Sequence, residues 1–321
     1  MKALLLEDKG QLSIREMPLP VPSKDEVLLK VSHCSICRTD AKMFRSGHRD
    51  LIMPRVMGHE ISAFNPENGK RFAVWPGRSC GNCPLCKKGL ENLCVNMKIT
   101  GFHRDGGFAE YISVLRSSLL EVPDEIPSEL VCFAELLASG LNAVEQQEIV
   151  PGEKILIVGA GPAGILAGLA FHFSKTKVSI MDKDPLKIEK CGVFSKQTGI
   201  EIKNDFGDML FDMTLNAAPG TGVFGECVKR LKPGGTLYFF SGISWDGIIP
   251  VSVLNEVHYR QLKICGVYGN TRKQMSEALE IISGNREIFK ELIEKKLKLE
   301  DVASAMDEVL SGTKFKYIVE F

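Results

Sequence analysis

A chain of 321 residues is long enough to bury a sizeable apolar core and to form two domains. Its 40 basic and 40 acidic side chains leave no formal net charge, which argues against nucleic acid or an anionic membrane surface as a partner. No apolar run reaches the roughly 18 residues of a membrane span, and acidic residues come too early for a secretory signal. We therefore expect a cytoplasmic protein with a small-molecule partner, in which the ten cysteines stay reduced and serve metal binding or catalysis.

The first part of the chain, residues 1–127, has the pattern of a β-rich domain. Short, often alternating apolar runs such as EVLLKVS and FAEYISVL are separated by turn-forming stretches such as PLPVPS and NPENG. This pattern predicts strands joined by long loops.

Within this domain, four cysteines follow the spacing C-x2-C-x2-C-x7-C: Cys80, Cys83, Cys86 and Cys94. Four thiolates at this spacing fit a closed tetrahedral zinc site. A four-iron cluster is the alternative, although a ferredoxin pattern normally continues with a closer cysteine followed by proline. We favour zinc, and because sulfur would fill all four positions, we expect the site to be structural.

Residues 128–268 alternate strand-like and helix-like segments, which is typical of a doubly wound parallel sheet. The apolar run KILIV leads into a G-x-G-x-x-G motif formed by Gly159, Gly161 and Gly164, with Pro162 inside it. This context predicts a dinucleotide site with the phosphates at the start of the following helix. Asp182 closes the next strand, where a carboxylate can accept hydrogen bonds from a ribose diol and repel a 2′-phosphate. The interpretation therefore favours NAD over NADP.

Several motifs occur in a fixed order: CRTD, GHE, the four-cysteine lobe, DGGFAEY, the glycine motif, KPGGTLYFF and LEDVASAMDEVLSG. Together they resemble the zinc-dependent medium-chain dehydrogenases, the superfamily of alcohol and polyol dehydrogenases. The resemblance implies an α/β protein with a GroES-like catalytic domain over 1–127 and a Rossmann domain over 128–268. It also implies that residues 269–321 complete the catalytic domain.

The resemblance further implies a catalytic zinc. Taken singly, a cysteine in CRTD, a histidine in GHE and a glutamate in a helix are ordinary residues. Cys37 and His59 stand at the positions of the family's first two catalytic zinc ligands. Glu135 stands at the position of the third ligand in the sorbitol-dehydrogenase-like subgroup. We choose Glu135 over Cys132, although Leu136 replaces the proline that usually follows this glutamate. The expected metal content is two zinc ions per chain.

The expected reaction transfers a hydride between a secondary alcohol or polyol and NAD(H) through a zinc alkoxide. In this scheme Thr39 takes the hydroxyl proton, Asp40 orients a ligand such as His59, and Arg38 meets the cofactor pyrophosphate. Glu60 either approaches the metal transiently or forms a structural ion pair. Lys42 stands where alcohol dehydrogenases carry the histidine that relays the proton to water. His48 is a candidate to replace that histidine, although a solvated loop histidine is its simpler interpretation.

Two alternatives stay open. One is a zinc-free reductase of the same superfamily, which the presence of both ligand sets argues against. The other is a catalytically inactive binding or redox-responsive homologue, for which Cys34 would be the reactive thiol, although a packed core residue is its simpler interpretation. The family also implies a homodimer or homotetramer.

Overall fold

The computed structural model describes residues 1–243 and 247–321. They separate into two compact units, which we call unit 1 (Met1–Glu135 with Asn270–Phe321) and unit 2 (Leu136–Gly269). The first division lies inside helix α4 (Ala134–Val144), eight residues later than the predicted position after residue 127. Among the described residues, no helix has the length and apolarity to cross a membrane.

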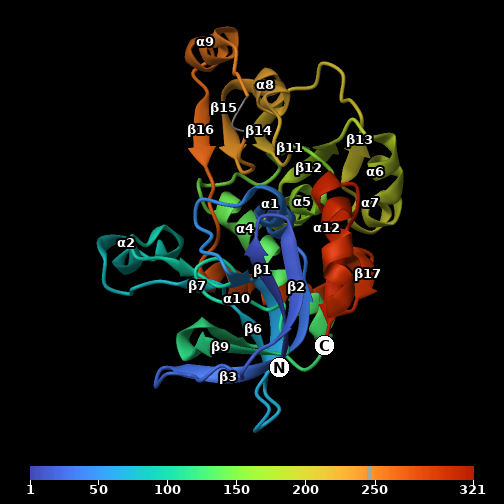
Figure 1. The fold of residues 1–321 in the computed structure, drawn as a ribbon. Helices are drawn as coiled ribbons and strands as arrows, with labels where there is room; N and C mark the ends of the chain where they lie inside the picture. Colours follow the sequence, from blue (N-terminus) through green and yellow to red (C-terminus); the bar gives the residue numbers. More distant parts are fainter. Residues whose placement is uncertain (244–246) are drawn as a thin grey trace. The chain divides into compact units, whose positions relative to one another are not determined.

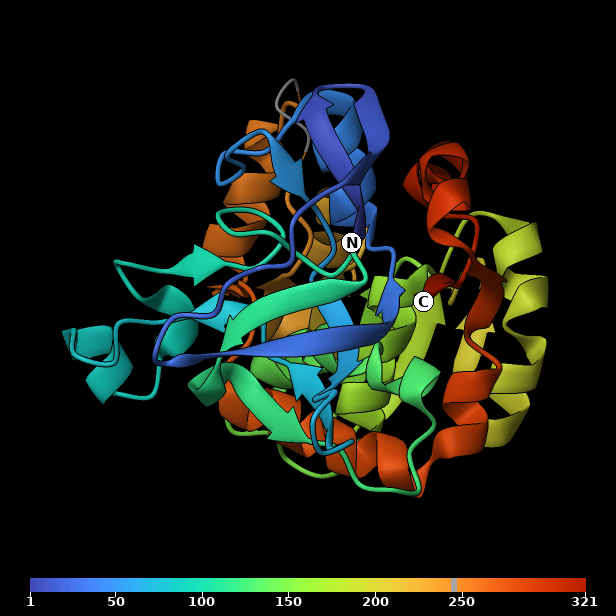
Figure 2. The same cartoon turned by 60° about the horizontal axis from the view of Figure 1, so that its bottom comes forward.

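Unit 1 is built on a seven-stranded sheet of order β10-β6-β5-β3-β18-β17, in which β9 also pairs with β3. Figure 2 shows β9 in green alongside β3 in blue. The strands of this sheet are β3 (Glu26–Ser35), β5 (Glu60–Phe64), β6 (Arg71–Val74), β9 (Tyr111–Leu115), β10 (Leu119–Glu121), β17 (Ile293–Leu297) and β18 (Lys316–Glu320). Because β18 pairs with β3, the last residues of the chain belong to the same sheet as residues 26–121.

Smaller elements complete unit 1. A three-stranded sheet has the order β2-β1-β4, and β7 pairs with β8. The bounds of these strands and of the helices are β1 (Lys2–Asp8), β2 (Gln11–Glu16), β4 (Arg55–Val56), β7 (Gly77–Arg78), β8 (Lys98–Ile99), α1 (Arg38–Ser46), α2 (Pro84–Lys87), α3 (Ser128–Val131), α10 (Arg272–Gly284), α11 (Arg286–Lys290) and α12 (Val302–Ser311), with 3-10 turns at Glu91–Leu93, Arg116–Ser118 and Leu299–Asp301. The apolar core lies among strands and helices distant in sequence and includes Leu29, Val31, Met43, Phe108 and Met306.

Unit 2 is a parallel sheet of order β13-β12-β11-β14-β15-β16. Its elements are β11 (Lys154–Val158), β12 (Lys177–Met181), β13 (Glu201–Lys203), β14 (Phe211–Asn216), β15 (Leu231–Phe239), β16 (Lys263–Gly266), α5 (Pro162–Phe173), α6 (Pro185–Lys190), α7 (Gly192–Thr198), α8 (Thr221–Lys229) and α9 (Val251–Tyr259) (Figure 1). The run KILIV forms the inner strand β11, whose last four residues are all buried. A strand with neighbours on both edges and helices on its faces has no solvent-facing side, which explains why its sequence is continuously apolar.

Candidate metal and cofactor sites

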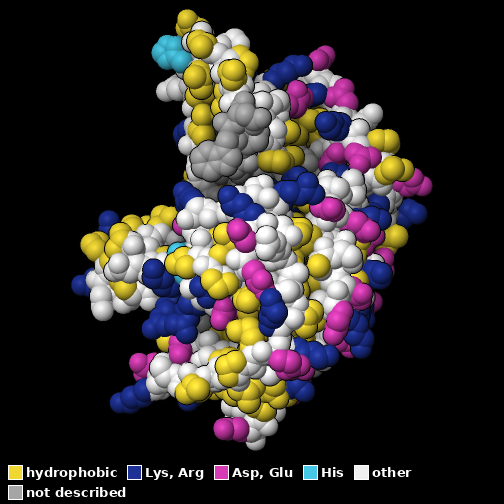
Figure 3. All heavy atoms as spheres, in the orientation of Figure 1, with side chains coloured by type: hydrophobic (Ala, Val, Ile, Leu, Met, Phe, Trp, Pro, Cys, Tyr) yellow, Lys and Arg dark blue, Asp and Glu magenta, His cyan; other side chains and the backbone are white. Residues whose placement is uncertain are grey.

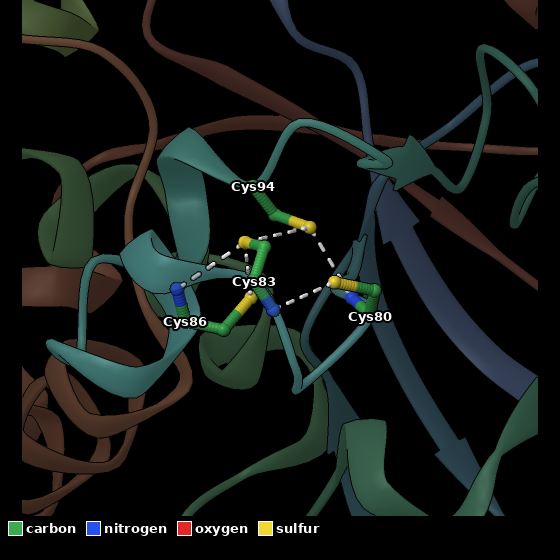
Figure 4. Close-up of side chains that lie close together, drawn as sticks. All are labelled: Cys80, Cys83, Cys86 and Cys94. Atoms are coloured by element: carbon green, nitrogen blue, oxygen red, sulfur yellow. Dashed lines mark hydrogen bonds between the residues drawn. The ribbon is translucent and has the colours of Figure 1, made fainter.

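The four-cysteine segment forms a small lobe between β7 and β8 (Figure 4). Cys83 begins the short helix α2, Pro84 follows at its first position, and Cys86 lies one turn along. The sulfur atoms of Cys80, Cys83, Cys86 and Cys94 all lie within 4.8 Å of one another. The Cys83 sulfur is 3.5 Å from that of Cys86 and 4.0 Å from that of Cys94.

These distances identify the kind of site. Four sulfurs bonded tetrahedrally to one zinc at about 2.3 Å would lie roughly 3.8 Å apart, which is the spacing the lobe shows. A multi-iron cluster would hold the sulfurs farther apart. Main-chain N–H groups also point at the sulfurs: that of Cys86 donates to Cys83 and lowers the pKa of its thiol to about 6. This hydrogen bond favours the thiolate form of Cys83, the form that a metal requires. Burial and the neighbouring sulfurs raise the pKa of Cys86 to about 11, so metal binding there would release a proton.

The second group of candidate ligands gathers where two paired strands of the large sheet, β3 and β5, meet at their ends. Cys37 follows β3 and caps helix α1, and His59 directly precedes β5. The register pairs Ser35 of β3 with Glu60 of β5, which brings the residues just beyond these strand ends together. As a result, ligand atoms of Cys37, His59 and Glu60 lie within 4.8 Å of one another.

Asp40 organises this group from the first turn of α1. It is fully buried, and its carboxylate accepts hydrogen bonds from the main-chain N–H groups of Cys37 at 2.8 Å and Gly58 at 3.3 Å. Its Oδ1 lies 3.4 Å from Nδ1 of His59. Burial lowers the pKa of His59, but the Asp40 carboxylate and the Cys37 sulfur outweigh burial and hold this pKa well above its ordinary value. With Nδ1 facing a carboxylate, Nε2 is the nitrogen that a metal would use, and metal binding would release the imidazolium proton.

Glu60 forms a buried ion pair with Lys316 of β18, with 2.6 Å between Nζ and Oε1. Ser35 also donates a hydrogen bond to the Glu60 carboxylate. Burial lowers the pKa of Lys316, and the Glu60 carboxylate more than reverses this effect. Sequence reasoning named Glu60 but missed both partners, because a lysine at the start of the last apolar strand and a serine at the end of β3 carry no local signal of this contact.

Glu135 lies in the first turn of α4 and accepts a hydrogen bond from Nδ2 of Asn270 at 2.8 Å. Burial raises the pKa of its carboxyl group, as does the charge of Glu60, while His59 and Lys316 act in the opposite direction. Glu135 therefore belongs to the same electrostatic environment as the ligand group. The Glu135 oxygens do not belong to the group of ligand atoms that lie within 4.8 Å of one another. Among the residues that the structure describes, the carboxylate in that group is that of Glu60.

The remaining predicted residues lie on or near α1. Thr39 is partly exposed in its first turn, where Cys37 rather than Thr39 takes the capping position. Nε of Arg38 donates to the main-chain oxygen of Leu310 at 3.0 Å. Lys42 is exposed on the helix. The ring of His48 contacts Phe102, whose ring also contacts His59, with centroid distances of 5.4 and 5.3 Å.

Cys34 lies in the core of unit 1 and is fully buried. Burial raises the pKa of its thiol well above the ordinary value. A buried, protonated thiol is a poor nucleophile, so the geometry does not favour Cys34 as a redox sensor.

The glycine motif of unit 2 forms the turn between β11 and α5. Gly159 has a φ of +123°, and a Cβ on Gly164 would stand 1.8 Å from the Gly159 carbonyl oxygen, so both positions require glycine. Gly161 and Pro162 begin α5. At the end of β12, Asp182 accepts the N–H of Ala160 at 2.8 Å and lies 3.7 Å from Nζ of Lys187. The strand order, with a reversal beside β11, is that of dinucleotide-binding sheets.

Comparison with known proteins shows what this chain is similar to. Residues 23–124 match the alcohol dehydrogenase GroES-like domain. Sorbitol dehydrogenase of Bacillus subtilis (strain 168) is 28% identical over 335 residues, which cover 97% of this chain and 94% of that protein.

Two solved structures share the fold over 100% of this chain and 99% of theirs. One, named as a zinc-binding dehydrogenase from Sinorhizobium meliloti 1021 and bound to NADP, has a TM-score of 0.89 at 24% identity. The other, named as a short chain alcohol dehydrogenase from Escherichia coli CFT073 and complexed with NADH, has a TM-score of 0.86 at 24% identity. These two structures confirm the fold class predicted from the sequence. The match of residues 23–124 and the likeness to sorbitol dehydrogenase support the predicted zinc-type medium-chain dehydrogenase/reductase superfamily.

Proposed function

We propose that this member of the zinc-type medium-chain dehydrogenase/reductase superfamily is a zinc- and NAD-dependent dehydrogenase of secondary alcohols or polyols. The observation that carries the proposal is the convergence of Cys37, His59 and a carboxylate beside the buried Asp40. A thiolate, an imidazole and a carboxylate are a donor set suited to zinc. Nδ1 of His59 faces the Asp40 carboxylate at 3.4 Å, which leaves Nε2 as the nitrogen available to the metal.

Zinc bound there would act as a Lewis acid that makes a substrate hydroxyl easier to ionise. The chain's own groups would do the rest. Cys37 and His59 would hold the metal, and Asp40 would keep His59 oriented. Thr39 would orient the substrate hydroxyl and relay its proton, accepting it while releasing the threonine hydroxyl proton to water.

For the third protein ligand we retain Glu135 as the proposal, with Glu60 as the competing carboxylate. The position of Glu60 inside the ligand group favours it by distance, whereas its ion pair with Lys316 opposes it. Zinc analysis of Glu135→Gln and Glu60→Gln separates the two. Loss of one zinc ion in Glu135→Gln alone supports the proposal, and its loss in Glu60→Gln alone would transfer the role to Glu60.

Unit 2 would bind the cofactor through Gly159, Gly161, Pro162 and Gly164, and Asp182 would recognise the adenosine ribose. Arg38 remains the proposed pyrophosphate ligand. The relatives support a nicotinamide cofactor, and the buried carboxylate of Asp182 favours NAD. A screen of secondary alcohols and polyols with NAD and with NADP tests this assignment. We expect NAD reduction with at least one of these alcohols, and a strong preference for NADP would refute the role of Asp182.

The proposed small-molecule partner is an alcohol or its carbonyl counterpart.

A second copy of the chain is the proposed protein partner. On the face in Figure 3, charges of both signs are interspersed and hydrophobic side chains are exposed over α9. Val251 and Tyr259 of α9 and Ile264 of the outer strand β16 are all exposed. An apolar strand edge of this kind is a ready pairing site. We expect a homodimer in sedimentation experiments and a monomer for Ile264→Lys; a wild-type monomer would overturn the assignment.

A further inference from the structure

A buried chain of hydrogen bonds links Trp75, Asn270 and Glu135 within unit 1. Nε1 of Trp75 donates to Oδ1 of Asn270 at 3.1 Å and to its main-chain oxygen at 3.2 Å. Nδ2 of Asn270 then donates to Oε1 of Glu135 at 2.8 Å and to the Glu135 main-chain oxygen at 3.0 Å. Trp75 and Asn270 are each only 5% exposed.

The chemistry of the three groups gives this chain a direction. An indole N–H can only donate a hydrogen bond, so it selects the oxygen end of the Asn270 amide. The NH2 end of the amide is thereby turned toward Glu135. A carboxylate can only accept a hydrogen bond, so the Glu135 carboxylate pairs with the NH2 end of the Asn270 amide. The opposite amide orientation would leave an indole donor facing an NH2 donor and an amide oxygen facing a carboxylate.

The position of these residues along the chain adds a second constraint. Glu135 is the last residue of unit 1 before the chain enters unit 2, and Asn270 is the first residue of unit 1 after the chain returns. Because Asn270 bonds both the carboxylate and the main chain of Glu135, it ties these two crossing points together. Trp75, which directly follows β6 of the large sheet, anchors the pair to that sheet.

We infer that Asn270 is a positioning residue for the Glu135 carboxylate and that Trp75 fixes the orientation of the Asn270 amide. This inference rests on the proposed function, in which Glu135 is a zinc ligand. The Asn270 amide holds the Glu135 carboxylate by one bond and the Glu135 main chain by another, so it fixes the carboxylate relative to its own backbone and favours a single orientation toward the metal. Groups that hold metal ligands in this way typically contribute about 10- to 100-fold to metal affinity or activity.

The test uses cobalt(II) in place of zinc, because its visible absorption reports ligand geometry without any turnover. Subtracting the spectrum of the cobalt-loaded Cys37→Ser variant from that of the wild type isolates the ion at the site of Cys37 and His59. Chelator competition then gives the cobalt affinity of that site. The informative variants are Asn270→Leu, which removes the amide, Asn270→Asp, which turns the donor into an acceptor, and Trp75→Phe, which removes only the indole N–H.

Asn142→Leu is the matched control. Asn142 is 4% exposed, its Oδ1 accepts from Gln146 at 2.8 Å, and its Nδ2 donates to the main-chain oxygen of Gly269 at 2.9 Å. It is thus an equally buried amide, fixed by a donor in the same way and bonded to the residue before Asn270. Its removal reports general damage to this part of the chain.

We expect Asn270→Leu and Asn270→Asp to weaken cobalt binding at this site by about 10- to 100-fold and to change its absorption bands. Trp75→Phe should cause a smaller loss of the same kind, and it answers the question even if the Asn270 variants fold poorly. Asn142→Leu should leave both readouts at the wild-type value.

Unchanged cobalt bands and affinity in the folded Asn270 variants and in Trp75→Phe would overturn this inference and leave the proposed function standing. Equal losses in Asn142→Leu would also overturn it. Identical spectra for the wild type and Cys37→Ser would instead show that no metal binds there, and the proposed function would fall together with the inference.

Discussion

Oδ1 of Asp40 lies 3.4 Å from Nδ1 of His59, and the side chains are 0% and 7% exposed. The same carboxylate accepts the main-chain N–H of Cys37. One buried acid therefore orients the imidazole and anchors the segment that carries the thiolate, so the two proposed ligands share a single support.

Asp40→Asn should weaken the metal site more than it weakens the fold. The amide can still accept the Cys37 N–H but no longer offers a negative charge to His59. We expect metal affinity and kcat to fall by about 10- to 100-fold, measured by chelator competition and by NAD reduction. Asp184→Asn is the control, because Asp184 likewise accepts a main-chain N–H at the start of a helix, α6, but lies in unit 2. Equal metal loss in both variants would contradict the role of Asp40.

Lys316→Met should destabilise unit 1 strongly. Breaking a buried ion pair on one side leaves the charge of Glu60 uncompensated, at a cost of about 3–5 kcal/mol. The double variant Lys316→Met with Glu60→Gln should recover part of this loss because no buried charge remains. Urea unfolding of the wild type, both single variants and the double variant measures the coupling. A loss below about 1 kcal/mol for Lys316→Met would argue that the contact is screened like a surface pair.

The free energy of unfolding should fall in mild acid because of His33. This side chain is 9% exposed, and both ring nitrogens are buried without a hydrogen bond. Burial lowers its pKa, Lys296 adds to this, and Glu129 and Glu320 oppose it, so the net pKa lies below the ordinary value of 6.5. The unfolded chain then binds the proton more readily, and stability present above pH 6.5 is lost as the pH falls toward the folded pKa.

His33→Leu should flatten this pH dependence of the free energy of unfolding. Well above pH 6.5, the free energies of unfolding of the two proteins should differ only by a constant. The measurement is urea unfolding of both proteins in steps from pH 8 to pH 5. Parallel curves over that whole range would show that His33 does not titrate as its burial requires.

The sequence predicted those parts of the molecule whose evidence is local. The four lobe cysteines lie within fifteen consecutive positions, and the glycine motif and its strand are contiguous, so spacing alone describes their chemistry. Lys316 and Glu60 are 256 residues apart, and Asn270 and Glu135 are 135 apart. Such contacts depend on strand register and on the path between the units, which no local pattern records.

The boundary inside α4 has the same explanation. The residues on both sides of Glu135 form one continuous helical pattern, so the sequence shows no break where the contacts divide. The family resemblance supplied Cys37, His59 and Glu135, but it carried no information on which carboxylate lies nearest the thiolate and the imidazole.

Removal of a lobe ligand should reduce stability before it reduces turnover. In Cys94→Ser we expect the loss of one zinc ion and a lower Tm, because metal binding to such a lobe is coupled to its folding. The kcat of the protein that remains folded should stay close to that of the wild type. Cys265→Ser, which changes a partly buried thiol outside both clusters, is the control. A loss of kcat without a change in Tm would place the chemistry at the lobe instead.

The most direct test of the central claim is the zinc content of purified protein, measured by elemental analysis for the wild type and for Cys37→Ser. We expect two zinc ions per chain in the wild type and one in the variant, with NAD-dependent alcohol oxidation lost together with the second ion. One zinc ion in an active wild type, or two in Cys37→Ser, would contradict the central claim.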